Sequence, residues 1–111
     1  MTKKEQYSLK FVKIKDSVNS DTYLCQGDFS VQGSLKLAHL LSILSNREPQ
    51  YLLEEVNLAL SNGDFEEYYL PDASVTDVIR IVPPNIIVNG FTITLLNLKQ
   101  LLQEWIAFTE S

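Results

Sequence analysis

Apolar and polar residues alternate along the first third of the chain, which is the pattern of half-buried strands. Residues 7–15 alternate on odd positions as far as Phe11 and on even positions from Val12. A shift of this kind predicts a strand with a bulge near Phe11 and Val12. Residues 22–31 alternate more regularly and place on one face Tyr23, Cys25, Phe29 and Val31. We therefore expect two strands, joined by a loop over 16–21 that is rich in Ser, Asn and Asp.

The spacing of apolar residues changes to that of helices after Gly33. Ser34 is the predicted N-cap of a first helix. The apolar stripe that follows it at helical spacing is Leu37, Leu40, Leu41 and Leu44. Pro49 favours the first turn of a second helix, which ends before Gly63. The predicted core stripe of this second helix is Leu52, Leu53, Val56, Ala59 and Leu60. Its opposite face carries Tyr51, Glu54, Glu55 and Leu58, so two apolar side chains stand among carboxylates and are expected to be exposed.

The last part of the chain predicts more strands and a closing helix. Residues 64–76 have no clear period and are expected to be extended, leading into a turn, whereas residues 78–82 are β-branched and predict a strand. Asn89-Gly90 is a strong hairpin signal that pairs Val88 with Phe91 and Ile86 with Ile93. Asn97 is the predicted cap of a final helix, with Gln100 completing a capping box. The buried stripe of that helix is Leu98, Leu101, Leu102, Trp105 and Phe108.

The order ββααβββα predicts an α+β fold. An antiparallel sheet of four or five strands, with the helices packed on one face, buries all of these stripes. The chain has 111 residues, 45% of them apolar and 21% charged, which is the composition of a single α+β domain over residues 1–111. The single Cys25 cannot form an intramolecular disulfide, and the longest apolar run, Trp105 to Phe108, is too short for a signal peptide or a membrane span. We therefore expect a cytoplasmic protein.

Charge is unevenly placed along the sequence. The net charge is −5, but residues 1–15 contain five Lys and one Glu, whereas residues 48–77 contain eight Asp and Glu and no Lys or Arg. This distribution predicts a continuous negative surface. Such a surface is either a solvated face or a docking surface for a basic protein partner.

Aromatic residues are interleaved with these carboxylates, which favours the docking interpretation. We expect at least one of Tyr68 and Tyr69 to be buried, and Tyr68 or Tyr69, with Tyr51 and Leu58, to supply apolar anchors inside an acidic rim. The candidate partner-binding residues are Tyr51, Glu54, Glu55, Leu58, Asp64, Glu66, Glu67, Tyr68 and Tyr69.

The sequence contains no catalytic, cofactor-binding or metal-binding motif. The acidic stretch does not have the ligand spacing of an EF-hand, and its adjacent carboxylate pairs point to different faces of their elements. His39 is the only histidine and is expected to be exposed, while Cys25 is expected to be buried and unreactive. The five N-terminal lysines lack a stacking platform for RNA and suit the protection of an edge strand. We expect no enzyme activity, no cofactor and no nucleic-acid or membrane partner.

A small acidic α+β domain of this kind resembles the immunity proteins of bacterial polymorphic and contact-dependent toxin systems. The resemblance rests on size, charge, the acidic stretch from Glu48 to Asp77 and the Glu104-Trp105 pair in a closing amphipathic helix. It implies an inhibitor, monomeric or weakly dimeric, that binds a basic toxin domain such as a nuclease. Two alternatives remain open: an adaptor that self-associates through a sheet edge or through Ile87, Thr92 and the outer face of residues 78–82, and a small-molecule-binding domain.

Overall fold

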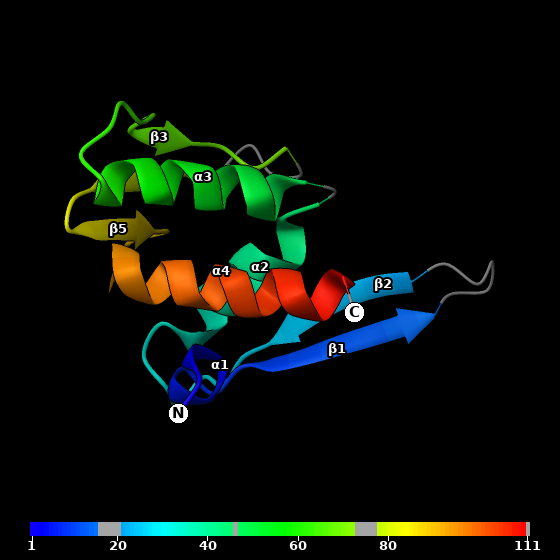
Figure 1. Ribbon diagram of the computed structural model, residues 1–111. Coiled ribbons are helices and arrows are strands. Elements are labelled where there is room, and N and C mark those ends of the chain that lie inside the picture. The colour runs from blue at the N-terminus through cyan, green and yellow to red at the C-terminus, as the bar shows by residue number, and fades with distance from the viewer. Residues whose placement is uncertain (16–20, 46, 73–77, 111) are drawn as a thin grey trace.

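The first two strands form an antiparallel hairpin of their own. A computed structural model describes residues 1–15, 21–45, 47–72 and 78–110, and Figure 1 shows the elements in chain order. Strands β1 (Lys10–Lys15) and β2 (Asp21–Gln26) pair residue for residue from Lys10↔Gln26 to Lys15↔Asp21. The predicted bulge is therefore wrong: Tyr7 and Leu9 precede the strand, which accounts for the change of phase. The loop predicted over 16–21 lies, apart from Asp21, outside the described residues.

The strand predicted over 22–31 ends early, at Gln26. Cys25 is buried as expected, but Phe29 is 88% exposed and belongs to the loop before the next helix. The inward position predicted for Phe29 is therefore wrong. The carboxylate of Asp28 explains the early end, because it accepts hydrogen bonds from both the N–H and the O–H of Ser30 and turns the chain.

A short N-terminal helix was not predicted. Helix α1 (Lys3–Gln6) begins with a capping box, in which Thr2 accepts from the Glu5 N–H and Glu5 accepts from the Thr2 N–H. The carboxylate of Glu104 accepts the backbone N–H groups of Lys3 and Lys4, each at 2.8 Å. A four-residue helix is marginal alone, so this contact with a residue about a hundred positions away holds it in place.

The stripe predicted for the first central helix is confirmed, and the stripe predicted for the second is confirmed in part. Helix α2 (Ser34–Ile43) begins after Gly33, which has a φ of 80°, and all four leucines of its stripe are buried. The predicted N-cap is wrong: Gly33 is the cap, and Ser34 is the first helical residue, whose hydroxyl accepts the Asp28 N–H. Helix α3 (Glu48–Leu60) has Pro49 in its first turn, as predicted. Leu52, Val56 and Ala59 are buried in it, whereas Leu60 is 39% exposed and lies outside the core stripe.

The other strands form a four-stranded antiparallel sheet in the order β3-β4-β5-β6. These strands are β3 (Tyr68–Tyr69), β4 (Ile79–Val82), β5 (Asn85–Val88) and β6 (Phe91–Thr94). The Asn89-Gly90 hairpin has the predicted pairs, Val88↔Phe91 and Ile86↔Ile93. The α+β class is confirmed, with the difference that β1 and β2 do not join this sheet. The extended segment predicted over 64–76 is described as far as residue 72; the remainder of that prediction lies outside the described residues.

Helix α4 (Leu95–Glu110) starts two residues before the predicted cap. The side chain of Thr94 accepts the N–H of Asn97 at 3.1 Å, so Thr94 caps the helix and Asn97 lies in its first turn. The amide of Asn97 instead donates to the phenol oxygen of Tyr7. The predicted stripe of α4 is confirmed, with Trp105 at its centre in contact with the rings of Phe11 and Phe108.

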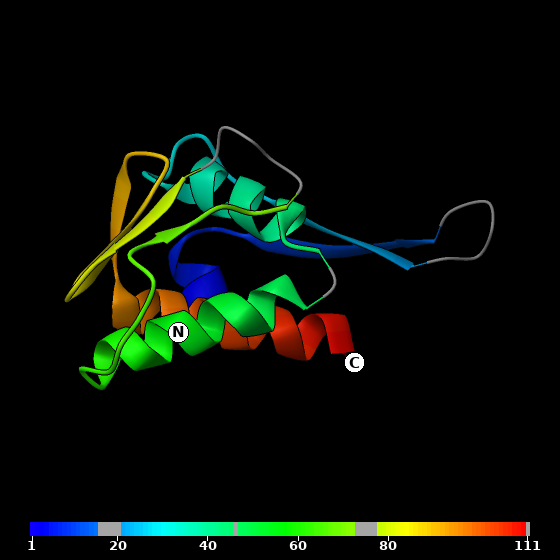
Figure 2. The same ribbon diagram turned by 90° about the horizontal axis from the view of Figure 1, so that it is seen from above.

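The helices cover one face of the four-stranded sheet (Figure 2). Ile79, Ile81, Ile86, Val88 and Ile93 point into the core, and the alternating residues Arg80, Val82 and Thr92 are exposed on the outer face. Helices α3 and α4 lie side by side, and the end of the β1–β2 hairpin extends past the C-terminal end of α4 (Figures 1 and 2). The hairpin packs on α2, where the Ser42 hydroxyl accepts the Cys25 N–H and donates to the Cys25 carbonyl oxygen.

Candidate protein-binding surface

The chain runs back along α3 after the helix ends, and residues 61–72 form what we call the return segment. The Gly63 N–H donates to the Leu58 carbonyl oxygen, and the Glu66 N–H donates to the Glu55 carboxylate at 2.9 Å. Further along, the Asp72 N–H donates to the carboxylate of Glu48, in the first turn of α3. The return segment is therefore antiparallel to α3, and two acidic stretches of the sequence lie next to each other.

The exposed part of this arrangement is the acidic ridge, which we define as Tyr51, Glu54, Leu58, Asp64 and Glu66. All five are exposed, with Tyr51 at 51% and Leu58 at 39%. The prediction that these two apolar side chains stand exposed among carboxylates is confirmed. Tyr51 and Leu58 are exposed because the opposite side of α3 packs against the core, so their side of the helix faces solvent.

Glu48 is not part of this surface, although it belongs to the acidic stretch. It is only 5% exposed, and its carboxylate accepts hydrogen bonds from the N–H and O–H of Ser45, the O–H of Tyr69 and the N–H of Asp72. Burial raises the pKa of Glu48, but these hydrogen bonds outweigh burial and hold the pKa below its ordinary value. Glu48 thus joins parts of the chain inside the protein, and its negative charge is not part of the predicted acidic surface.

Two other candidate residues have structural partners. Tyr69 is half-buried and donates to Glu48, and burial followed by this hydrogen bond raises its pKa well above the ordinary value. Glu55 is half-buried and accepts the Glu66 N–H. Tyr69 is therefore the more buried of the adjacent tyrosines, and Tyr68 is the exposed one, at 56%.

Glu67 and Tyr68 share a cation with the neighbouring strand. Arg80 lies opposite Tyr68 in the sheet, its guanidinium carbon is 5.6 Å from the centroid of the Tyr68 ring, and its Nε lies 2.7 Å from the Glu67 carboxylate. Strand alternation places Tyr68 on the outer face of the sheet, away from Tyr69. The structure thus divides the nine candidate residues into the acidic ridge, a neutralised cluster around Arg80, and two residues with internal roles.

His39 and Cys25 follow the expectations from the sequence. His39 is exposed, and Cys25 is buried, which raises the pKa of its thiol to about 12. Within the described ranges, no group of three or more His, Cys, Asp and Glu side chains is arranged to hold a metal ion. Lys13 of the basic hairpin lies 3.5 Å from Asp21 of the facing strand.

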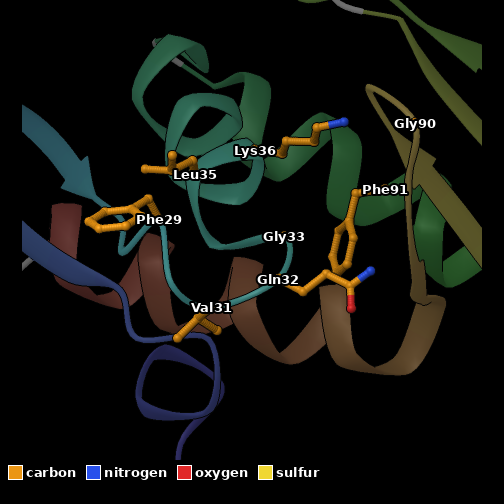
Figure 3. Close-up of a pocket in the computed structure, with 8 residues that line it drawn as sticks. All are labelled: Phe29, Val31, Gln32, Gly33, Leu35, Lys36, Gly90 and Phe91. Atoms are coloured by element: carbon orange, nitrogen blue, oxygen red, sulfur yellow. The ribbon is translucent and has the colours of Figure 1, made fainter.

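One surface feature was missed by sequence reasoning. A groove of about 270 Å³ lies between the loop that carries Phe29, the start of α2 and the β5–β6 turn (Figure 3). Alternation placed Phe29 in the core, so no exposed apolar site was expected there. The Asp-Phe-Ser sequence at 28–30 is a turn signal that could have indicated it.

The comparisons with known proteins give no family. No protein-family model, curated protein or solved structure matches this chain. In the part of the chain that the structure describes, no helix combines the length and apolar character needed to cross a membrane.

Proposed function

We propose that this protein is a protein-binding module that docks its acidic ridge on the basic surface of a partner, and that the partner is a toxin domain which it inhibits. The observation that supports this is the antiparallel course of the return segment beside α3. It puts Asp64 and Glu66 next to a helix face that carries Glu54, and no Lys or Arg occurs between residues 48 and 77. The resemblance to immunity proteins adds the inhibitory role.

The two kinds of side chain on the ridge have different tasks. The carboxylates attract a basic partner over about 10 Å at ordinary salt and thereby raise the association rate. Tyr51 and Leu58 then provide apolar contact area that slows dissociation. The partner is expected to offer Lys and Arg side chains around an apolar depression.

A charge-matched pair of variants tests the ridge. Glu54→Gln with Glu66→Gln removes two charges from the ridge, and Glu5→Gln with Glu110→Gln removes two exposed charges elsewhere. Each protein is used to capture partners at about 50 mM and about 500 mM salt, because screening weakens an electrostatic complex. The proposal requires a salt-sensitive partner that the ridge variant loses and the control retains. Equal capture by both variants would show that the ridge is only a solvated face.

The inhibitory role has its own test. A toxin-like reading frame beside the gene, ending in a basic C-terminal domain, is expressed with and without this protein, and cell growth is measured. Rescue by the wild type and by the control, but not by the ridge variant, is the expected result. Binding without rescue would leave a docking module that is not an inhibitor.

The outer sheet face is a weaker candidate for self-association. Its row Tyr68, Arg80, Ile87 and Thr92 is continuous across the four strands. Strands of two to four residues make a face of about 250 Å². A stable interface needs roughly 800 Å² on each partner. This face is therefore too small to hold a dimer alone, and sedimentation at two concentrations should show a monomer.

A further inference from the structure

The groove beside Phe29 has an apolar end. Phe29 is 88% exposed and Leu35 is 53% exposed, and the two side chains are neighbours in Figure 3. The loop that carries Phe29 is fixed by hydrogen bonds: the Asp28 N–H donates to the hydroxyl of buried Ser34 at 2.8 Å, and Ser30 donates twice to the Asp28 carboxylate. Phe29 is thus held in water by an ordered loop, which is a costly arrangement for an apolar side chain.

The other end of the groove is polar and positive. The ammonium of Lys36 lies over the β5–β6 turn and donates to the carbonyl oxygen of Asn89. Figure 3 shows Lys36 and Gln32 on either side of the Phe91 ring. No ion pair among the described residues involves Lys36, so its charge is not neutralised by a carboxylate there.

The size of the groove limits what can enter it. Pockets that hold drug-sized ligands have volumes of about 300 Å³ or more. At about 270 Å³, this groove suits a short, narrow molecule. Its lining includes Gly33, where the Phe91 ring lies so close that an added Cβ would be 2.2 Å from a ring carbon. The close packing of these two residues fixes the shape of the groove.

We infer that this groove binds a small amphiphilic carboxylate, with its apolar body against Phe29 and Leu35 and its carboxylate at Lys36. A medium-chain acyl or aryl carboxylate has this chemistry. The site is separate from the acidic ridge and does not depend on the function proposed for it.

The overall charge of the protein makes the test discriminating. At a net charge of −5, the protein as a whole attracts cations, so unspecific binding favours an amphiphilic amine over an amphiphilic acid. A site built around Lys36 has the opposite preference. Octanoate, octanol and octylammonium have the same chain length and differ in charge, which separates the two cases.

The experiment is an amide NMR titration of the intact protein with each probe below its micelle concentration. Octanoate should bind most tightly and octylammonium most weakly, with shifts concentrated at Gly33, Lys36, Gly90 and Phe91. Lys36→Gln should weaken the affinity for octanoate about fivefold without changing the affinity for octanol. Because Lys36 is exposed, the variant should keep the fold, which its own spectrum verifies.

A matched pair of leucine variants tests the apolar end. Leu35→Ala should weaken the affinity for octanoate about fivefold. Leu70→Ala should leave this affinity unchanged, because Leu70 has a similar exposure but lies on the return segment. The inference is overturned if octylammonium binds as well as octanoate, if Lys36→Gln has no effect, or if the two leucine variants behave alike.

Discussion

The carboxylate of Glu48 accepts the phenolic O–H of Tyr69 at 2.9 Å, and this bond joins the first turn of α3 to the return segment. The same carboxylate also accepts from Ser45 and Asp72, so one buried side chain connects three parts of the chain. The position of the acidic ridge depends on this connection.

Replacing Glu48 should destabilise the protein. Glu48→Gln keeps the shape but puts an NH2 group against N–H and O–H donors, and we expect a loss of about 2–3 kcal/mol in the free energy of unfolding. Chemical denaturation measures it. Glu54→Gln removes the same charge from an exposed position of the same helix and should change stability by less than about 0.5 kcal/mol. A small effect at residue 48 would mean that the buried carboxylate is dispensable.

The same residue should make stability depend on pH. The pKa of Glu48 is lowered in the folded protein from its ordinary value of 4.5, so the unfolded chain binds the proton first as the pH falls. The stabilisation from Glu48 is therefore present above the ordinary value and is lost as the pH falls through the folded value. Denaturation curves between about pH 3 and pH 7 should show this decline, and Glu48→Gln should flatten it. Parallel profiles for both proteins would contradict the assignment.

Adjacent tyrosines provide a second matched pair. Tyr69→Phe deletes the O–H that Glu48 accepts and should cost about 1–2 kcal/mol, because a hydrogen bond to a buried carboxylate is lost. Tyr68→Phe changes a side chain that is 56% exposed and should be nearly neutral. Equal melting temperatures for the two variants would argue against the Glu48–Tyr69 bond.

Glu104 should control the N-terminal helix. Glu104→Ala removes the acceptor for the N–H groups of Lys3 and Lys4, so α1 should detach while the core stays folded. Hydrogen exchange should show lost protection of the α1 amides in this variant alone. Glu110→Ala, near the end of the same helix, serves as the control.

Gly33 and Gly63 should respond differently to alanine. At Gly33, φ is positive and the new Cβ would lie 2.2 Å from the Phe91 ring. Gly33→Ala should therefore lower the free energy of unfolding by about 2–4 kcal/mol. At Gly63, the nearest atom is a terminal methyl of exposed Leu58 at 3.2 Å, which can move. Gly63→Ala should therefore be much milder, and thermal denaturation of both variants gives the comparison.

Local patterns predicted the elements that local physics determines. The leucine stripe of α2, the proline at the start of α3 and the Asn89-Gly90 register all depend on neighbours within a few residues, and all are confirmed. The α1 helix was missed because it depends on Glu104, a contact between the two ends of the chain. The α4 cap was misplaced by three residues because Asn ranks above Thr as a capping residue, whereas the helix uses Thr94.

The candidate site was predicted only in part. Helical spacing was enough to predict that Tyr51 and Leu58 are exposed on the side of α3 away from the core. Sequence could not show that Glu48 is buried, because a carboxylate enters a core only when donors from distant residues such as Asp72 meet it there. For the same reason Arg80, outside the acidic stretch, was not expected to neutralise Glu67.

The hydroxyl of Ser42 has a consequence for how this protein behaves when concentrated. By bonding both backbone groups of Cys25, it takes the place that a neighbouring strand would occupy, so at this point β2 offers nothing for another chain to pair with. The opposite strand of the hairpin presents Lys10, Lys13 and Lys15, whose mutual repulsion opposes stacking with a second copy. The hairpin thus has a side-chain hydroxyl in place of a pairing strand at Cys25 on one edge, and lysines that oppose strand pairing on the other.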